Sequence, residues 1–253
     1  MQLRDKVVLI TGGRRVGGHL ARAVAERGAH VAMSYLTSAA KIDATLQDVR
    51  ESGVRGVSAK ADLRDPADVD RLVRTVTDEL GRIDVLVNMT STFTPTPFDS
   101  LTPADLEREL ASNLVAPYLT AVAVARQMRR QPIVDGIQGK IVNFADWGVE
   151  RPYKNFLPYF VAKGGVATMT LALAVELAPT IAVNAIAPAM IDPPPELTPD
   201  DIEAIRMASP LQRIGCPADA VNAVLYLLEG TDFVTGSVLR VDGGRFLGAT
   251  HDE

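Results

Sequence analysis

Seven short apolar runs recur along the chain, mostly rich in β-branched residues and unbroken by polar alternation. Such runs are typical of strands that are buried on both faces, as in a parallel sheet. Longer amphipathic stretches separate them, which predicts helices that join parallel strands by right-handed crossovers. The sequence therefore predicts an α/β fold with a doubly wound, seven-stranded parallel sheet flanked by helices. The runs are Val7–Thr11, Val31–Tyr35, Val54–Ala59, Ile83–Asn88, Lys140–Ala145, Ile181–Ile186 and Val238–Val241.

Local signals mark the ends of several connecting helices. Leu20–Arg27 is followed by Gly28, and glycine is the commonest residue just beyond a helix. Ala67–Leu80 follows an Asp-Pro pair and precedes a glycine, so it carries both a start and a stop signal. Thr102 precedes a proline and an acidic first turn, which predicts another helix start.

We expect one domain over residues 1–253, because no shift in composition and no internal repeat divides the chain. The irregular region is 188–210, which holds six prolines and follows a predicted strand. Open α/β sheets bind ligands beyond the carboxyl ends of their strands, so we expect a substrate flap there. The alternative is a plain surface insertion.

Composition excludes several classes of protein. The formal net charge is −5, so no overall field would draw the chain to nucleic acid or anionic membranes. No unbroken apolar run approaches the roughly 18 residues that span a bilayer, and the four apolar residues Val7–Ile10 are too few for a signal peptide. The single cysteine, Cys216, fits a reducing cytoplasm, and the three histidines lack metal-ligand spacing.

Residues 11–18 (TGGRRVGG) lie where the first strand should turn into the first helix. Glycines let a backbone approach a diphosphate closely, and a helix N-terminus offers free N–H groups and positive dipole. We therefore expect a nucleotide at this turn. The alternative is an ordinary tight turn.

The end of the second predicted strand favours NADP over NAD. Sites for NAD usually place an acid there, whereas this chain has residues 34–38 (SYLTS) with no carboxylate. The hydroxyls of Thr37 and Ser38, facing the guanidinium groups of Arg14 and Arg15, would suit a 2′-phosphate. The alternative is that both arginines are only solvated.

Tyr159 and Lys163 are four residues apart on a predicted helix and should share one face. A tyrosine with a pKa near 10 is a poor proton donor at neutral pH, and a nearby ammonium favours the ionised phenol. The pair therefore indicates general acid–base catalysis, with an ordinary surface pair as the alternative.

These features together resemble the short-chain dehydrogenase/reductase family over nearly the whole chain. The shared motifs are the glycine turn, Asp62-Leu63, Asn88, Asn113, the Tyr159 and Lys163 pair, and residues 241–244 (VDGG). The resemblance implies NAD(P)-dependent hydride transfer on a Rossmann-type fold, commonly in a homotetramer.

The resemblance also implies roles for the matching residues. Tyr159 would donate a proton, Lys163 would lower its pKa and bind the nicotinamide ribose, and Asn113 would support a proton relay through water. Asp62 and Leu63 would flank the adenine. The residues expected at the cofactor are Gly12, Arg14, Arg15, Val16, Gly17, Tyr35, Thr37, Ser38, Asp62, Leu63, Asn88, Tyr159, Lys163 and Pro188.

Asp146 departs from the family pattern, which usually has serine thirteen residues before the tyrosine. A carboxylate there would repel the oxyanion of ketone reduction, so simple carbonyl chemistry becomes a weaker hypothesis. A carboxyl group suits a substrate with ring nitrogens or N–H donors. The pteridine reductase branch of the family is similar here, with aspartate in place of serine.

The segment after the fourth predicted strand is similar to the same branch. Residues 91–97 (STFTPTP) resemble a segment in which a phenylalanine stacks on the pterin and a serine binds it, which implies Phe93 and Ser91. Trp147 is expected to line this pocket, with an ordinary core position as the alternative. Residues 146–151, 233–236 and 242–245 resemble bacterial dihydromonapterin and dihydrofolate reductases.

The glycine turn is a second departure. Val16 stands where the family has glycine or arginine, unless the loop is one residue shorter than usual. Met89 and Thr90 replace the usual Asn-Ala beside the nicotinamide. The diphosphate turn is therefore altered in either alignment.

We predict an NADPH-dependent reductase of a dihydropterin, dihydromonapterin or dihydrofolate, in the cytoplasm, with no metal. Asp146 either donates a proton or orients Tyr159 or a water molecule. One alternative is a short-chain carbonyl reductase or alcohol dehydrogenase acting on a ketone, 3-oxoacyl thioester or sugar. Another is a non-catalytic NADP-binding protein. The expected substrate contacts are Ser91, Phe93, Asp146, Trp147 and Tyr159.

Overall fold

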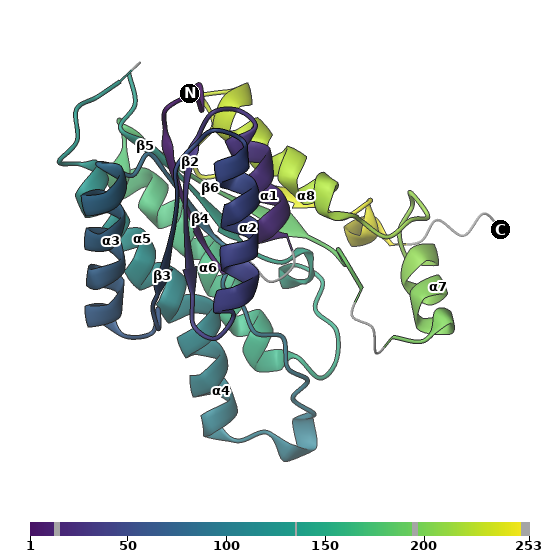
Figure 1. The fold of residues 1–253 in the computed structure, drawn as a ribbon. Coiled ribbons are helices and arrows are strands. Elements are labelled where there is room, and N and C mark those ends of the chain that lie inside the picture. The colour runs from purple at the N-terminus through teal and green to yellow at the C-terminus, as the bar shows by residue number, and fades with distance from the viewer. Residues whose placement is uncertain (13–15, 135, 194–196, 249–253) are drawn as a thin grey trace.

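The computed structural model describes residues 1–12, 16–134, 136–193 and 197–248. Parallel strands form one sheet in the order β3-β2-β1-β4-β5-β6-β7 (Figure 1). Successive strands are added in one direction from β1 to β3 and in the opposite direction from β4 to β7. Doubly wound sheets bind ligands at the point between β1 and β4 where this order reverses. The predicted fold is confirmed. The strands are β1 (Val7–Thr11), β2 (His30–Tyr35), β3 (Gly56–Lys60), β4 (Val85–Asn88), β5 (Gly139–Phe144), β6 (Ile181–Pro188) and β7 (Val238–Val241).

Helices cover both faces of the sheet, so the molecule has three layers (Figure 1). Helices α1, α2 and α8 pack on one face, and α3, α5 and α6 pack on the other. Two short π-helical segments, Ala111–Val115 and Tyr226–Gly230, continue α4 and α8. The α-helices are α1 (Gly17–Ala25), α2 (Ala39–Glu51), α3 (Pro66–Leu80), α4 (Pro103–Leu110), α5 (Ala116–Met128), α6 (Leu157–Leu177), α7 (Pro199–Met207) and α8 (Pro217–Leu225).

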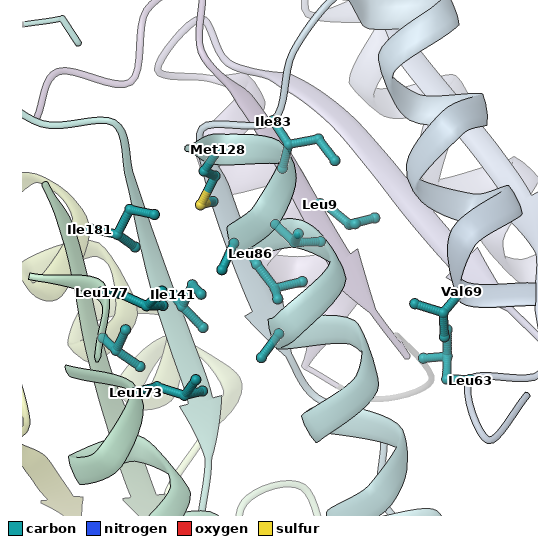
Figure 2. Close-up of a cluster of buried hydrophobic side chains, with 14 of the residues drawn as sticks. Leu9, Leu63, Val69, Ile83, Leu86, Met128, Ile141, Leu173, Leu177 and Ile181 are labelled. Carbon is teal, nitrogen blue, oxygen red and sulfur yellow. The ribbon is translucent and has the colours of Figure 1, made fainter. Parts of the chain in front are cut away.

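The core consists of one apolar layer on each side of the sheet. Figure 2 shows the layer under α3, α5 and α6, where Leu9 and Leu86 on the strands meet Met128 and Leu173 on the helices. The central strands β1 and β4 are buried along their whole length, as expected for strands covered on both faces. The edge strands β3 and β7 are only partly buried, because each has a neighbour on one side only.

Helix α6 is apolar enough and long enough to cross a membrane by composition, although it contains no unbroken apolar run of that length. Its buried residues, such as Val166 and Leu173, contribute to the core under the sheet. Packing in the core therefore accounts for its apolar character. It also carries Tyr159 and Lys163 into the interior.

The proline-rich region expected to form a flap contains helix α7 in its described part. Thr198 begins this helix through a capping box, in which its hydroxyl accepts from Asp201 N while the Asp201 carboxylate accepts from Thr198 N at 3.0 Å. Helix α7 projects beyond the main layers on the side where β6 ends (Figure 1).

Candidate active site

A buried polar network lies at the carboxyl ends of the central strands. The Thr11 hydroxyl donates to Asn88 Oδ1 at 3.2 Å, and Asn88 Nδ2 donates to Asn143 Oδ1 at 3.0 Å. Asn143 Nδ2 donates in turn to the Thr170 hydroxyl on α6 at 3.0 Å. The network links β1, β4 and β5 to the helix that carries Tyr159, so it fixes the floor of the site.

Glycine backbone forms a close-packed cradle above β1. Gly12 has a φ of +70°, and a Cβ there would lie 3.2 Å from the backbone nitrogen of Thr90. A Cβ on Gly17 would lie 2.9 Å from the Gly12 carbonyl oxygen. Helix α1 begins at Gly17 behind Val16, with no side chain capping its N-terminus. This cradle fits a dinucleotide diphosphate, because the free N–H groups and the helix dipole favour an anion.

The arginines expected at the cofactor, Arg14 and Arg15, lie outside the described residues. Tyr35 ends β2, and the exposed Thr37 and the N-cap Ser38 follow it. The Ser38 side chain makes no capping hydrogen bond to α2, so its hydroxyl is not committed to that helix.

The other predicted cofactor residues also lie at this edge of the sheet. Asp62 and Leu63 follow β3, and Leu63 is buried. The Asp62 carboxylate accepts from Arg64 Nε at 2.8 Å, which lowers the pKa of Asp62. Pro188 is the last residue of β6, and Asn88 is the last of β4. The structure thus gathers the described members of the predicted set along the carboxyl ends of the strands.

Tyr159, Asp146 and Lys163 meet at the N-terminal end of α6. The Tyr159 hydroxyl donates to Asp146 Oδ2 at 2.7 Å. Asp146 follows β5, and its other oxygen accepts from Gly148 N at 2.7 Å. The buried Lys163 ammonium donates to the Phe144 carbonyl at 2.8 Å and lies 5.9 Å from the centre of the Tyr159 ring. The carboxyl group, phenol and ammonium therefore form one connected group.

Burial controls the titration of all three residues. It raises the pKa of Tyr159 well above its ordinary value, and the Asp146 charge acts in the same direction. Burial also raises the pKa of Asp146, against its hydrogen bond from Tyr159, and lowers the pKa of Lys163 to about 8. Burial and Asp146 thus determine the direction of the Tyr159 shift, and the lowering expected from Lys163 stays a prediction.

Asn113 binds the loop after β4 with its whole side chain. Its Oδ1 accepts from the Ser91 hydroxyl at 2.7 Å and from Thr92 N at 3.0 Å. Its Nδ2 donates to the Thr92 hydroxyl at 3.1 Å and to Glu109 Oε2 at 2.7 Å. The amide oxygen accepts two hydrogen bonds and the amide nitrogen donates two. The Asn113 side chain therefore fixes the Ser91–Thr92 segment. The water relay expected of Asn113 stays a prediction.

Glu109 is fully buried four residues before Asn113, at 0% exposure. Its Oε2 accepts from both Asn113 and the Thr92 hydroxyl, the latter at 3.2 Å. Its Oε1 has no hydrogen-bond partner among the described residues, and the nearest cation is Arg108 Nε at 3.5 Å. Sequence analysis missed Glu109, and its place within the helical turn before Asn113 was the available signal.

Other aromatic rings pack around the ring of Tyr159. Phe93 stacks on Phe156 with ring centres 4.2 Å apart and meets Tyr159 edge-on at 4.9 Å. One face of Phe93 is thus already covered, although half of its surface, 50%, is exposed. The Ser91 hydroxyl acts to lower the pKa of the Tyr159 phenol, which indicates that Ser91 lies near Tyr159. The structure therefore brings Ser91 and Phe93 to Tyr159.

Two cavities lie on the side of Asp146 away from the glycine cradle. The Trp147 cavity, of about 560 Å³, is lined by Trp147, Arg151, Pro152, Tyr153, Ala208, Arg245, Leu247 and Gly248. The Arg240 cavity, of about 330 Å³, lies between the end of β6, α7 and the segment after β7, and its lining includes Arg213, Arg240 and Arg245. Both volumes are in the range of small-molecule sites. Sequence analysis missed Arg245, which lines both.

Among the described residues, no group of three His, Cys, Asp or Glu side chains is arranged to hold a metal ion.

Comparisons with known proteins identify the family of this chain. Residues 13–245 match the family model described as enoyl-(acyl carrier protein) reductase. The chain is 36% identical to (2S)-[(R)-hydroxy(phenyl)methyl]succinyl-CoA dehydrogenase subunit BbsD of Thauera aromatica, over 98% of this chain and 99% of that protein. It is 30% identical to the 3-oxoacyl-[acyl-carrier-protein] reductase of Synechocystis, over 96% and 97%.

A solved short-chain dehydrogenase/reductase from Serratia marcescens superimposes on 97% of this chain and 100% of its own, with a TM-score of 0.88 and 28% identity. The match of the family model, the full-length relatives and the shared fold agree. The chain belongs to the short-chain dehydrogenase/reductase family, whose members are oxidoreductases that use NAD or NADP.

Proposed function

We propose that the protein interconverts an alcohol and a carbonyl compound, with Tyr159 and Asp146 as a coupled proton donor and acceptor. The observation that carries this proposal is the 2.7 Å hydrogen bond from the Tyr159 hydroxyl to Asp146 Oδ2. The relatives support it, because one is named as the dehydrogenase of a hydroxy-substituted acyl-CoA and another as a 3-oxoacyl reductase. They favour this alternative over the pterin hypothesis.

The proton route follows from the hydrogen bond. In alcohol oxidation the substrate hydroxyl gives its proton to the Tyr159 oxygen while Tyr159 passes its own proton to Asp146 Oδ2. In carbonyl reduction the protonated Asp146 returns a proton to Tyr159 as the phenol protonates the new alkoxide. A dinucleotide whose diphosphate lies in the glycine cradle would accept or supply the hydride through its nicotinamide ring.

The same geometry resolves the objection that Asp146 would repel a developing oxyanion. Its two oxygens already accept from Tyr159 and from Gly148 N. Burial raises the pKa of Asp146, so the group holds a proton more readily than an ordinary aspartate. In its protonated form it adds no charge beside the substrate oxygen, and carbonyl reduction becomes compatible with aspartate at this position.

The remaining assignments are proposals of the same kind. NADP is the proposed cofactor, because Thr37 and Ser38 follow β2 where NAD sites place an acid. The Ser38 hydroxyl makes no capping hydrogen bond to α2. Lys163 holds the Phe144 carbonyl and would bind the nicotinamide ribose. We propose one domain over residues 1–253 with a flap at 188–210, acting in the cytoplasm as a homotetramer.

Substitution of the phenol tests the proposal. Tyr159→Phe should lower kcat for both oxidation and reduction at least about 100-fold, because it removes the proton donor and the link to Asp146. Binding of NADPH, followed by its fluorescence, should stay within about threefold. Turnover of alcohols that survives this substitution would overturn the proposal.

Pterin reduction remains the second candidate, because Asp146 accepts from the Tyr159 hydroxyl and Phe93 contacts the Tyr159 ring. The substitution Asp146→Ser separates the two candidates. A carbonyl or alcohol substrate should retain activity within about tenfold, because a serine hydroxyl, the usual residue of the family there, can orient Tyr159 and pass its proton on to water. Reduction of 7,8-dihydrobiopterin, followed by NADPH absorbance, should fall at least about 100-fold if the pterin hypothesis is correct.

A further inference from the structure

Arg245 differs from the other arginines around the two cavities, because within the described chain its guanidinium has neither an acidic partner nor a hydrogen bond, whereas that of Arg151 donates to backbone carbonyls. Arg213 pairs with Asp219 at 2.6 Å, and Arg240 pairs with Glu150 at 2.7 Å. Within the described chain no carboxylate lies within ion-pair distance of the Arg245 guanidinium, which instead lies 4.9 Å from the centre of the Trp147 ring. The contact is a cation–π interaction that orients the group.

The backbone around Arg245 is rigidly held. The Asp242 carboxylate accepts from Gly244 N at 3.0 Å and from Phe246 N at 2.9 Å, on either side of Arg245. Arg151 donates to the carbonyl oxygens of Arg245 and Phe246, at 3.2 and 3.0 Å. These bonds fix the segment without using the Arg245 guanidinium, so that group is available to a ligand.

The positive charge of Arg245 is not neutralised by an ion pair within the described chain. Arg245 is half-buried, and burial together with repulsion from Arg151 lowers its pKa. The acid that attracts it is Asp146, whose oxygens are already engaged with Tyr159 and Gly148. Because a partly desolvated guanidinium gains most from a carboxylate that it can bind through two parallel hydrogen bonds, this place favours an anionic ligand.

The position of Arg245 relates this charge to the reaction. It lines both cavities, and Trp147, on which it stacks, directly follows Asp146 in the chain. We infer that Arg245 binds a carboxylate of the substrate, so that the protein acts on hydroxy acids or keto acids whose carboxylate reaches the Trp147 cavity. This inference rests on the proposed alcohol–carbonyl reaction and names the substrate class for it.

Binding can be measured without turnover, because Trp147 is the single tryptophan of the chain. The NADP-loaded protein is titrated with 4-phenylbutanoate and with the neutral 4-phenylbutanamide, and Trp147 fluorescence is followed. We expect the acid to bind at least about tenfold more tightly than the amide. Arg245→Met should abolish this preference, and Arg245→Lys should retain part of it, since lysine keeps the charge but not the two-pronged geometry.

Arg240→Met serves as the matched control, because it removes a guanidinium from the Arg240 cavity that Glu150 already neutralises. It should leave the preference for the acid unchanged. Equal binding of acid and amide by the unaltered protein, or an equal loss of preference in the Arg240 and Arg245 variants, would overturn the inference. Thermal melting of each variant shows that the comparison is between folded proteins.

Kinetics then separate this inference from the proposed function. With 4-oxo-4-phenylbutanoate as substrate, Arg245→Met should raise KM at least about tenfold and change kcat less than threefold, while the methyl ester is unaffected. An equal fall in kcat for acid and ester would show that Arg245 acts on Asp146 instead, which would overturn the inference. If the unaltered protein reduces neither ketone but still prefers 4-phenylbutanoate, the proposed reaction fails while the carboxylate site stands.

Discussion

Asp146 shows how one buried carboxyl group determines the chemistry of its neighbours. It accepts from the Tyr159 hydroxyl and is attracted by Lys163, so the protonation of each residue depends on the others. From sequence, the presence of an aspartate at this position was visible, but the effect of burial was not. Burial raises the pKa of Tyr159, and this could not be predicted because sequence spacing gives the distance between side chains but not their desolvation.

The pH dependence of alcohol oxidation should report these residues. A protonated Asp146 cannot accept the Tyr159 proton, so in the unaltered protein the rate should fall as the pH drops through the pKa of this group, which burial raises above its ordinary value. It should fall again above a pH of about 8, where Lys163 loses its charge. In Asp146→Ser the acidic limb of the kcat profile should disappear and the alkaline limb should remain. An acidic limb that survives would assign it to another group.

At the scale of elements, the site depends on the contact between α4 and the loop after β4. Glu109 on α4 binds both Asn113 and Thr92, and Asn113 binds Ser91, which lies near Tyr159. The helix start at Thr102 was predictable, because capping is a local property. The π-helical turn that carries Asn113 was not predictable, since it depends on packing against α6.

Glu109→Leu tests this contact. A leucine removes the acceptor of both Asn113 Nδ2 and the Thr92 hydroxyl, so these two donors lose the bonds that hold the Ser91–Thr92 segment. We expect kcat to fall about tenfold with little change in KM, and stability to fall by about 1.5–3 kcal/mol in urea denaturation. Rescue by Glu109→Asp is expected to be partial.

Glu107→Leu is the control on the same helix, because Glu107 is exposed. It should change neither kcat nor the urea midpoint. If Glu109→Leu behaves as this control does, Glu109 has no part in positioning the loop.

For the whole molecule, the doubly wound parallel sheet could be predicted, because buried runs and crossover rules act along the entire chain. The partial burial of β3 and β7 could not be predicted, since a run gives no indication of how many neighbours its strand has. The half-buried Arg245 was missed for a similar reason: its partners come from η3 (Trp147–Val149), far away in sequence.

Lys140 joins distant parts of the molecule and gives a test of stability. Its buried ammonium donates to the carbonyl oxygens of Leu227, Leu228 and Thr231 at 2.7–3.0 Å. Lys140→Met should lower the free energy of unfolding by at least about 2 kcal/mol, because each buried carbonyl left without a donor costs about 1–3 kcal/mol.

Urea denaturation measures this loss, with Asp232→Asn as the comparison. Asp232 pairs with Lys140 at 2.6 Å but is half exposed, so its replacement should cost about 1 kcal/mol or less. A loss for Lys140→Met no greater than that for Asp232→Asn would show that the carbonyl contacts contribute little.

The hydrogen bond from Asn143 to Thr170 has a practical consequence for protein engineering. Thr170 is on α6 with Tyr159 and Lys163. Its hydrogen bond with Asn143 therefore helps to fix the position of α6 relative to the sheet. A designer who transplants the reactive pair into another scaffold therefore has to transplant the asparagine and threonine with it. Without this hydrogen bond, the transplanted tyrosine and lysine would be placed incorrectly relative to the sheet of the new scaffold.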